Sequence, residues 1–132
     1  ELVTEVKNNP ATSDIEDIKA GFKNGVQVGW VLKVSTTGFS SNIVMLVGID
    51  KDGKLGEAVI LDQKETPGLG TKITEAEFIR QPAIKNAVPG EDLRLNKDNG
   101  KVQAVSGATI SSRAVVRGIN QVFSFYKNQT SI

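Results

Sequence analysis

Two segments of the sequence gather residue types that could hold a phosphorylated ligand. The first, residues 106–113, reads Ser-Gly-Ala-Thr-Ile-Ser-Ser-Arg and lies at the start of a predicted long helix. Hydroxyls and unpaired N–H groups at a helix start suit a phosphate, and the helix dipole adds positive potential there. The alternative is N-capping by Thr109 or Ser111, which needs no ligand.

A glycine-rich loop is the second segment. Residues 65–72 read Glu-Thr-Pro-Gly-Leu-Gly-Thr-Lys. Gly68 and Gly70 remove side chains, so a flat ligand could approach the backbone closely. Thr66 offers a hydroxyl and Leu69 an apolar surface. An ordinary connecting loop is the alternative interpretation of this segment.

The composition excludes most other chemistries. The 132 residues contain no His and no Cys, which excludes disulfides, Cys nucleophiles, Ser-His-Asp triads and thiolate or imidazole metal sites. Residues 50–53 (Asp-Lys-Asp-Gly) resemble the start of a calcium loop but lack its later ligands, so a hairpin turn and no metal are expected. The net charge of +1 and the lack of a basic stripe argue against nucleic-acid binding.

Turn signals and apolar periodicity predict the elements that must position these segments. Helices are expected over about 13–20, 75–81 and 110–126. A β-hairpin is expected over 22–34, with its second strand over 26–34, and further strands are expected over about 42–49, 55–62, 93–95 and 101–105. Ser13 and Glu16 fit a capping box, Asn24-Gly25 fits a hairpin turn, and the continuous apolar run 42–49 is typical of a strand covered on both faces. The fold class is therefore α+β: one domain, residues 1–132, with helices packed on an antiparallel β-sheet.

Most of the chain, from about residue 25 to 126, resembles a known flavoprotein family. The matching stretches read GWVLKV, IVMLVGIDKDGKLGEAVIL, ETPGLGTKI, FIRQ and VSGATISSRAVVRGI. They are similar to the covalently flavinylated FMN-binding domain that occurs in the G subunit of Rnf electron-transport complexes and in the C subunit of sodium-translocating NADH:quinone reductases. Gln103 stands three residues before Ser106, where that family commonly has an acidic residue.

The resemblance implies a cofactor and the residues that hold it. In the family, a magnesium-dependent flavin transferase moves the FMN part of FAD onto the last Thr of the Ser/Thr-Gly-Ala-Thr motif, which here is Thr109. The expected site comprises Thr109 with covalent FMN, together with Ser106, Gly107, Ala108, Ser111, Ser112, Arg113, Glu65, Thr66, Gly68, Leu69, Gly70 and the aromatic Phe39. Because Thr109 is an acceptor of FMN, no catalytic residue is expected in this chain.

The resemblance also implies a function and a location. The expected protein is an electron carrier that exchanges electrons with other subunits of a membrane ion-translocating complex and has no substrate chemistry of its own. Family members hold this domain on the extracytoplasmic side of the cell membrane by one N-terminal transmembrane helix. Residues 1–11 are therefore expected to be an extended segment that follows an anchor absent from this sequence.

Two other functions fit parts of the sequence. A non-redox regulatory or sensory module could use the same fold to bind flavin or another phosphate ligand reversibly. A hydrolase with Ser106 or Thr109 as nucleophile would need a general base, and none is visible in the sequence.

Overall fold

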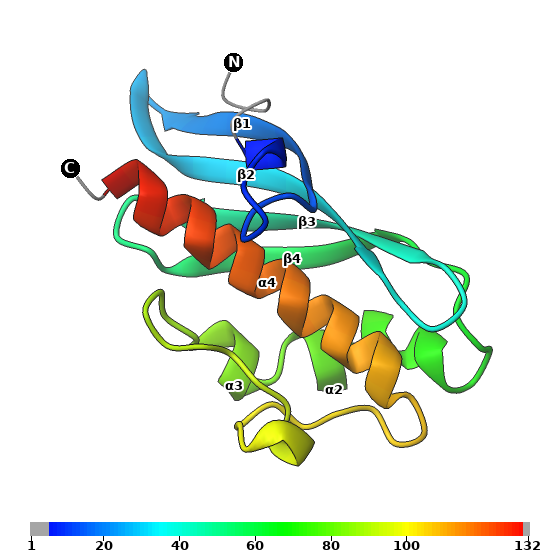
Figure 1. Cartoon of the computed structure of the whole chain (residues 1–132). Coiled ribbons are helices and arrows are strands. Elements are labelled where there is room, and N and C mark those ends of the chain that lie inside the picture. The colour runs from blue at the N-terminus through cyan, green and yellow to red at the C-terminus, as the bar shows by residue number, and fades with distance from the viewer. Residues whose placement is uncertain (1–5, 131–132) are drawn as a thin grey trace.

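A four-stranded antiparallel sheet with one long helix across it forms the frame of the molecule (Figure 1). The computed structural model describes residues 6–130. The elements are β1 (Ile15–Lys23), β2 (Val26–Thr37), β3 (Asn42–Asp50), β4 (Leu55–Asp62), η1 (Gly70–Thr74), α2 (Ala76–Ile79), α3 (Pro82–Lys85), η2 (Asn96–Asp98) and α4 (Thr109–Thr130), and the strand order is β1-β2-β3-β4. The predicted α+β class is confirmed.

The core lies between the sheet and α4. The predicted apolar stripe of the helix is buried at Val115, Ile119, Val122 and Phe123, and Tyr126 is half-buried. The helix approaches β3 so closely at Gly118 that an added Cβ would collide with the Met45 side chain. This close packing fixes the direction of α4 and therefore the place where its first turn meets the loops of the sheet.

Both predicted hairpin turns are present. Asn24 and Gly25 have φ values of 52° and 80°, which is the type I′ geometry that matches strand twist. In the second turn the Asp50 carboxylate accepts hydrogen bonds from the N–H groups of Asp52 and Lys54, both at 2.9 Å, and Gly53 has a φ of 86°. The segment 50–53 is therefore a side-chain-supported β-turn.

The predicted helix over residues 13–20 is wrong, because this segment starts the edge strand β1. The Ser13 hydroxyl donates to the Pro10 carbonyl at 3.2 Å and does not cap a helix, while Glu16 is exposed. A bulge between Ile15 and Asp17 shifts the register, so Ile15 pairs with Val34 and Ile18 with Leu32. The bulge thus gives the i, i+3 apolar spacing that a helix would also produce.

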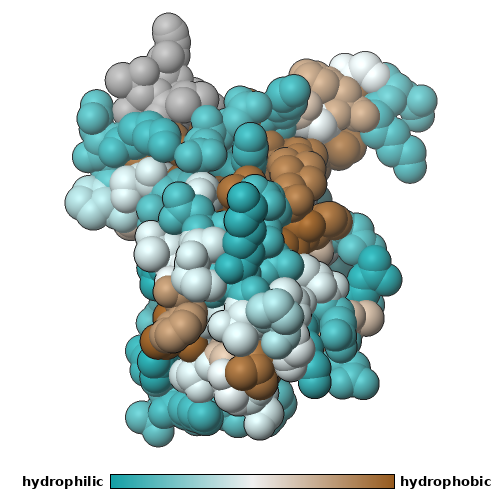
Figure 2. Space-filling view, turned by 90° about the vertical axis from the view of Figure 1, so that its right-hand side faces the viewer, coloured by the Kyte–Doolittle hydropathy of each residue, from teal (hydrophilic) through white to brown (hydrophobic). Residues whose placement is uncertain are grey.

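The second face of the sheet is less covered than the sequence predicts. Along β3, Ile43, Met45, Val47 and Ile49 are buried beneath α4, whereas the alternate residues Val44, Leu46 and Gly48 are only half-buried. The prediction that both faces of β3 are covered is therefore wrong. Figure 2 shows hydrophobic patches on a mainly hydrophilic surface, seen from the right-hand side of Figure 1.

Three further predictions need correction. The strands expected over 93–95 and 101–105 reduce to one parallel bridge between Leu95 and Val102. The helix expected over 75–81 is the shorter α2, preceded by Glu75. The segment 6–11 is not extended, since residues 6 and 7 are helical, turns follow them and Val6 is buried. The rest of the predicted N-terminal segment lies outside the described residues.

Within residues 6–130, no helix combines the length and the apolar character that crossing a bilayer requires.

Candidate functional site

One cavity brings together the two segments that the sequence singles out. It has a volume of about 410 Å³ and lies between the loop after β2, the glycine-rich loop and the first turn of α4. Its lining residues are Phe39, Thr66, Leu69, Gly70, Gly107, Ala108, Thr109, Ile110 and Ser111. A hollow of about 460 Å³ lies elsewhere, around α3 and residues 91–101, but it contains none of the predicted site residues.

The cavity combines an apolar wall with a hydroxyl at its edge. Phe39, Leu69 and Ile110 expose 67%, 43% and 49% of their surface, an unusual gathering of large apolar side chains at one opening. Thr109 is the first residue of α4 and is half-buried. The site can therefore accept a flat apolar group against the wall and a reactive or phosphorylated end near Thr109.

The start of α4 presents unpaired N–H groups beside this hydroxyl. The Ser112 N–H donates to the Ala108 carbonyl at 3.0 Å. In the part of the chain that the structure describes, no acceptor is bonded to the N–H groups of Ile110 and Ser111. The hydroxyls of Thr109 and Ser111 do not cap these groups, so the helix end keeps its capacity to bind an anion.

The buried Glu65 side chain connects the loop after β2 with the start of α4. Its carboxylate is buried, with 3% of the residue exposed, and accepts hydrogen bonds from the Phe39 N–H at 2.7 Å and the Ser40 N–H at 3.1 Å. It also accepts bonds of 2.6 Å from the hydroxyls of Ser41 and Ser111. One side chain therefore ties the loop after β2 to the first turn of α4, although the family resemblance led us to expect Glu65 near the cofactor itself.

These hydrogen bonds decide the charge state of Glu65. Burial favours the neutral acid and would raise its pKa. The hydroxyls of Ser111 and Ser41 and the N–H groups of Phe39 and Ser40 more than offset this effect and lower the pKa from 4.5 to about 2. The carboxylate is ionised at every physiological pH.

Glycines allow the loops to approach one another. A Cβ at Gly70 would lie 2.5 Å from the Glu65 Cβ and 2.8 Å from the Ser111 Oγ, and a Cβ at Gly38 would lie 2.5 Å from a Glu65 carboxylate oxygen. Gly107, with a φ of 75°, lies beside Leu69, whose Cδ2 would be 3.1 Å from an added Cβ. Small residues are thus required where the loops meet.

The remaining predicted residues do not line the cavity. The Ser112 hydroxyl donates to the Ala108 carbonyl at 2.8 Å and accepts from the Val105 N–H at 3.0 Å. Ser106 borders a different hollow, and Gly68 is an exposed turn residue with a φ of 76°. Ser112 therefore has a structural role in shaping the turn before α4.

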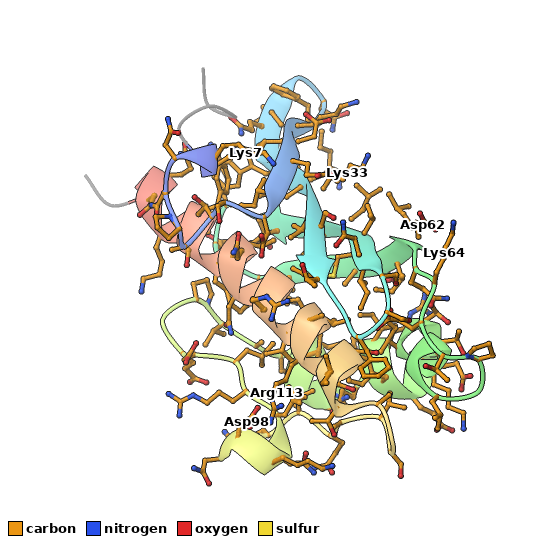
Figure 3. The ribbon with its side chains drawn as sticks, turned by 45° about the vertical axis from the view of Figure 1, so that its right-hand side comes forward. Lys7, Lys33, Asp62, Lys64, Asp98 and Arg113 are labelled. Atoms are coloured by element: carbon orange, nitrogen blue, oxygen red, sulfur yellow. The ribbon has the colours of Figure 1, made fainter. Side chains whose placement is uncertain are left out.

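Arg113 faces a carboxylate and not the cavity. Its guanidinium donates to both Asp98 oxygens, at 2.7 and 2.8 Å, and joins η2 to the second turn of α4 (Figure 3). This bidentate pairing raises the pKa of Arg113, and the hydrogen bond from Arg113 lowers the pKa of Asp98. The positive charge of Arg113 is therefore already balanced.

Sequence reasoning missed two residues at the site. Ile110 lines the cavity, and its position directly after Thr109 was the available signal. The Lys97 ammonium on η2 donates a 3.0 Å hydrogen bond to the Thr109 hydroxyl. Nothing in the local sequence distinguishes Lys97 from Lys101, so this contact could only come from the structure.

The fold and the cavity are compatible with a domain that binds a ligand with a flat apolar part and an anionic end. Residues 38–124 match the family described as "FMN-binding domain". The chain belongs to this family.

Relatives and a solved structure agree with this assignment. The chain is 31% identical to the G subunit of the Na(+)-translocating ferredoxin:NAD(+) oxidoreductase complex of Acetobacterium woodii, over 87% of this chain and 57% of that protein. It is 36% identical to the G subunit of the ion-translocating oxidoreductase complex of Methanosarcina acetivorans, over 80% of this chain and 55% of that protein. The crystal structure of NqrC from Shewanella oneidensis superposes with a TM-score of 0.68 and 25% identity, over 85% of this chain and 59% of that one. The chain thus spans a little over half the length of these relatives.

Proposed function

We propose that this chain is an electron-carrying flavin domain in which FMN is joined to the Thr109 hydroxyl through a phosphoester. The observation that carries the proposal is the position of this hydroxyl, at the first residue of α4 and at the edge of the 410 Å³ cavity. The volume is within the roughly 300–1,000 Å³ typical of small-molecule sites. Membership of the FMN-binding family supports the choice of cofactor.

The lining residues fit the two ends of FMN. The phosphate would lie at Thr109, beside the unpaired N–H groups of Ile110 and Ser111, where the helix dipole stabilises an anion. The isoalloxazine ring would lie against the apolar wall formed by Phe39 and Leu69. FMN supplies the redox chemistry, while the chain orients the cofactor and limits its contact with water.

We further propose that the full protein works within a membrane ion-translocating complex, with this domain on the extracytoplasmic side. The names of the relatives, which are G subunits of ion-translocating oxidoreductases, support a role in such a complex. A covalent link has a physical purpose outside the cytoplasm, because a dissociable flavin would be lost by dilution. A magnesium-dependent flavin transferase would attach the cofactor.

Co-expression with and without a flavin transferase tests the attachment. The wild-type chain should gain the mass of FMN less one water and should stay fluorescent in a denaturing gel, and Thr109→Ala should show neither property. Flavin that leaves in denaturant, with no mass adduct, would instead support a reversible regulatory or sensory module.

A further inference from the structure

Among the described residues, the ammonium group of the exposed Lys97 is the only one that contacts the Thr109 hydroxyl, the proposed acceptor of FMN. Its Nζ lies 3.0 Å from the Thr109 Oγ1. An ammonium has three N–H donors, so further donors stay available beyond this bond. No carboxylate of residues 6–130 lies within ion-pair distance of Lys97. Its charge is therefore uncompensated at the point where the proposed phosphate would sit.

A hydrogen-bonded turn positions Lys97 beside the Thr109 hydroxyl. The N–H groups of Asp98 and Gly100 both donate to the Leu95 carbonyl, at 2.9 and 2.8 Å, and the Asn96 N–H donates to the Val102 carbonyl at 2.7 Å. A Cβ at Gly100 would collide with the Arg94 backbone, so the tight turn requires glycine there. The backbone around Lys97 is thus fixed by bonds that do not involve its side chain.

The neighbouring ion pair between Asp98 and Arg113 leaves Lys97 as the cation that can pair with a phosphate at Thr109. Asp98 holds the Arg113 guanidinium in a bidentate pair and ties η2 to α4 (Figure 3). Arg113 is therefore engaged, although it is one helical turn beyond Thr109 and carries the same charge. Because Asp98 is paired with Arg113, it does not compensate Lys97 either. The pair positions the turn, and the ammonium beside it faces the hydroxyl.

We propose that Lys97 is a positioning residue for flavin attachment and the charge partner of the phosphate once FMN is linked to Thr109. This inference rests on the proposed attachment at Thr109. In that step the Thr109 Oγ1 bonds to the flavin-side phosphorus of FAD, the P–O bond of the pyrophosphate breaks and AMP leaves, while the hydroxyl proton passes to the transferase or to solvent. The linked phosphate keeps one negative charge, which a charge-assisted hydrogen bond from Lys97 stabilises.

The test compares the variants Lys97→Met and Lys97→Arg with the control Lys101→Met. Lys101 is an exposed lysine of the same segment, so its replacement by Met removes the same charge at a different place. Each purified apo-protein is incubated with transferase, FAD and magnesium, and the adduct is followed by intact mass. Lys97→Met should lower the initial rate of attachment roughly tenfold, Lys97→Arg should restore most of it, and Lys101→Met should behave as wild type. Equal rates for Lys97→Met and Lys101→Met would overturn the proposal.

A second readout separates the phosphate contact from recognition by the transferase. In the fully flavinylated proteins, the ³¹P resonance of the linking phosphate should shift in Lys97→Met and stay in place in Lys101→Met. Slower attachment in Lys97→Met without any change in this resonance would overturn the proposed contact between Lys97 and the linking phosphate. If the wild-type chain itself gains no adduct at Thr109, the proposed function fails. If the wild-type chain is flavinylated but Lys97→Met and Lys101→Met react at equal rates, only the proposal for Lys97 fails. Unchanged urea midpoints will verify folding, as expected for exposed side chains.

Discussion

The two sides of the Thr109 cavity use charge in opposite ways. On the loop side, the carboxylate of Glu65 is buried and surrounded by N–H and O–H donors from residues 39–41 and 111. On the η2 side, Asp98, Arg113 and Lys97 lie at the surface, with 34% and 47% of the Asp98 and Arg113 side chains exposed. The first arrangement fixes the shape of the cavity, and the second holds the Lys97 ammonium beside the Thr109 hydroxyl at the cavity edge.

We therefore expect stability and flavin attachment to depend on different sides of the cavity. A buried charge is tolerated only when hydrogen bonds replace its lost hydration, so the loss of one partner is costly. Exposed ion pairs contribute little to stability because water and salt screen them. Changes on the Glu65 side should weaken folding, whereas changes on the η2 side should affect attachment of the cofactor alone.

The largest expected effect comes from Glu65→Ala. Removal of the carboxylate leaves the buried Ser111 hydroxyl and the part-buried Phe39 N–H without acceptors, which should lower the free energy of unfolding by about 3 kcal/mol. Urea denaturation measures this loss. The matched control is Glu57→Ala, whose exposed carboxylate is 3.6 Å from Arg80 and should cost less than about 0.5 kcal/mol. Similar losses in both variants would contradict the contrast between the two sides.

Low pH should weaken the contribution of Glu65 to the stability of the fold. The folded pKa of Glu65 is lowered from 4.5 to about 2, so its ionised form stabilises the fold above pH 4.5, and this contribution is lost as the pH falls toward 2. The difference in pKa corresponds to about 3 kcal/mol. Urea titrations between pH 6 and pH 2 should show this loss in wild type, relative to Glu65→Gln. Parallel pH profiles of the two proteins would refute the assignment.

A smaller effect is expected from Gly70→Ala. The new methyl group would lie 2.5 Å from the Glu65 Cβ, and displacement of the loop should cost about 1–3 kcal/mol. Gly56→Ala is the control, because the nearest atom to its Cβ would be 3.7 Å away; its urea midpoint should stay close to that of wild type. A neutral Gly70→Ala would mean that the loops are looser than the hydrogen bonds indicate.

The smallest effect on stability belongs to Asp98→Asn. Loss of the exposed pair with Arg113 should leave the urea midpoint unchanged within error. The less constrained η2, which carries Lys97, should nonetheless slow flavin attachment, as followed by intact mass. A clear fall in stability would show that the η2 side also carries the fold.

Local signals in the sequence were sufficient for the turns and the long helix, but not for the edge strand. Asn24-Gly25 and the apolar stripe that contains Ile119 each have one simple structural meaning. Ile15 and Ile18 do not, because a bulged strand and a helix both bring an i, i+3 pair to one face. The strand forms through its pairing with β2, a contact that local pattern does not encode.

The site shows the same division. The nearness of Thr109 to the glycine-rich loop was expected from the family resemblance, and the structure places both at one cavity. The bond between Glu65 and Phe39 spans 26 positions, and that between Lys97 and Thr109 spans 12. Such contacts depend on how whole elements pack, so neither the clamping role of Glu65 nor the position of Lys97 could be predicted from residue types and spacing.

Peptide mapping of the flavinylated chain decides where FMN is attached. After co-expression with a flavin transferase, the protein is denatured, digested and analysed by tandem mass spectrometry. We expect FMN, less one water, on Thr109 within the peptide that contains residues 106–113. An unmodified Thr109 in the presence of an active transferase, or FMN on Ser106, Ser111 or Ser112 in its place, would show that Thr109 is not the acceptor.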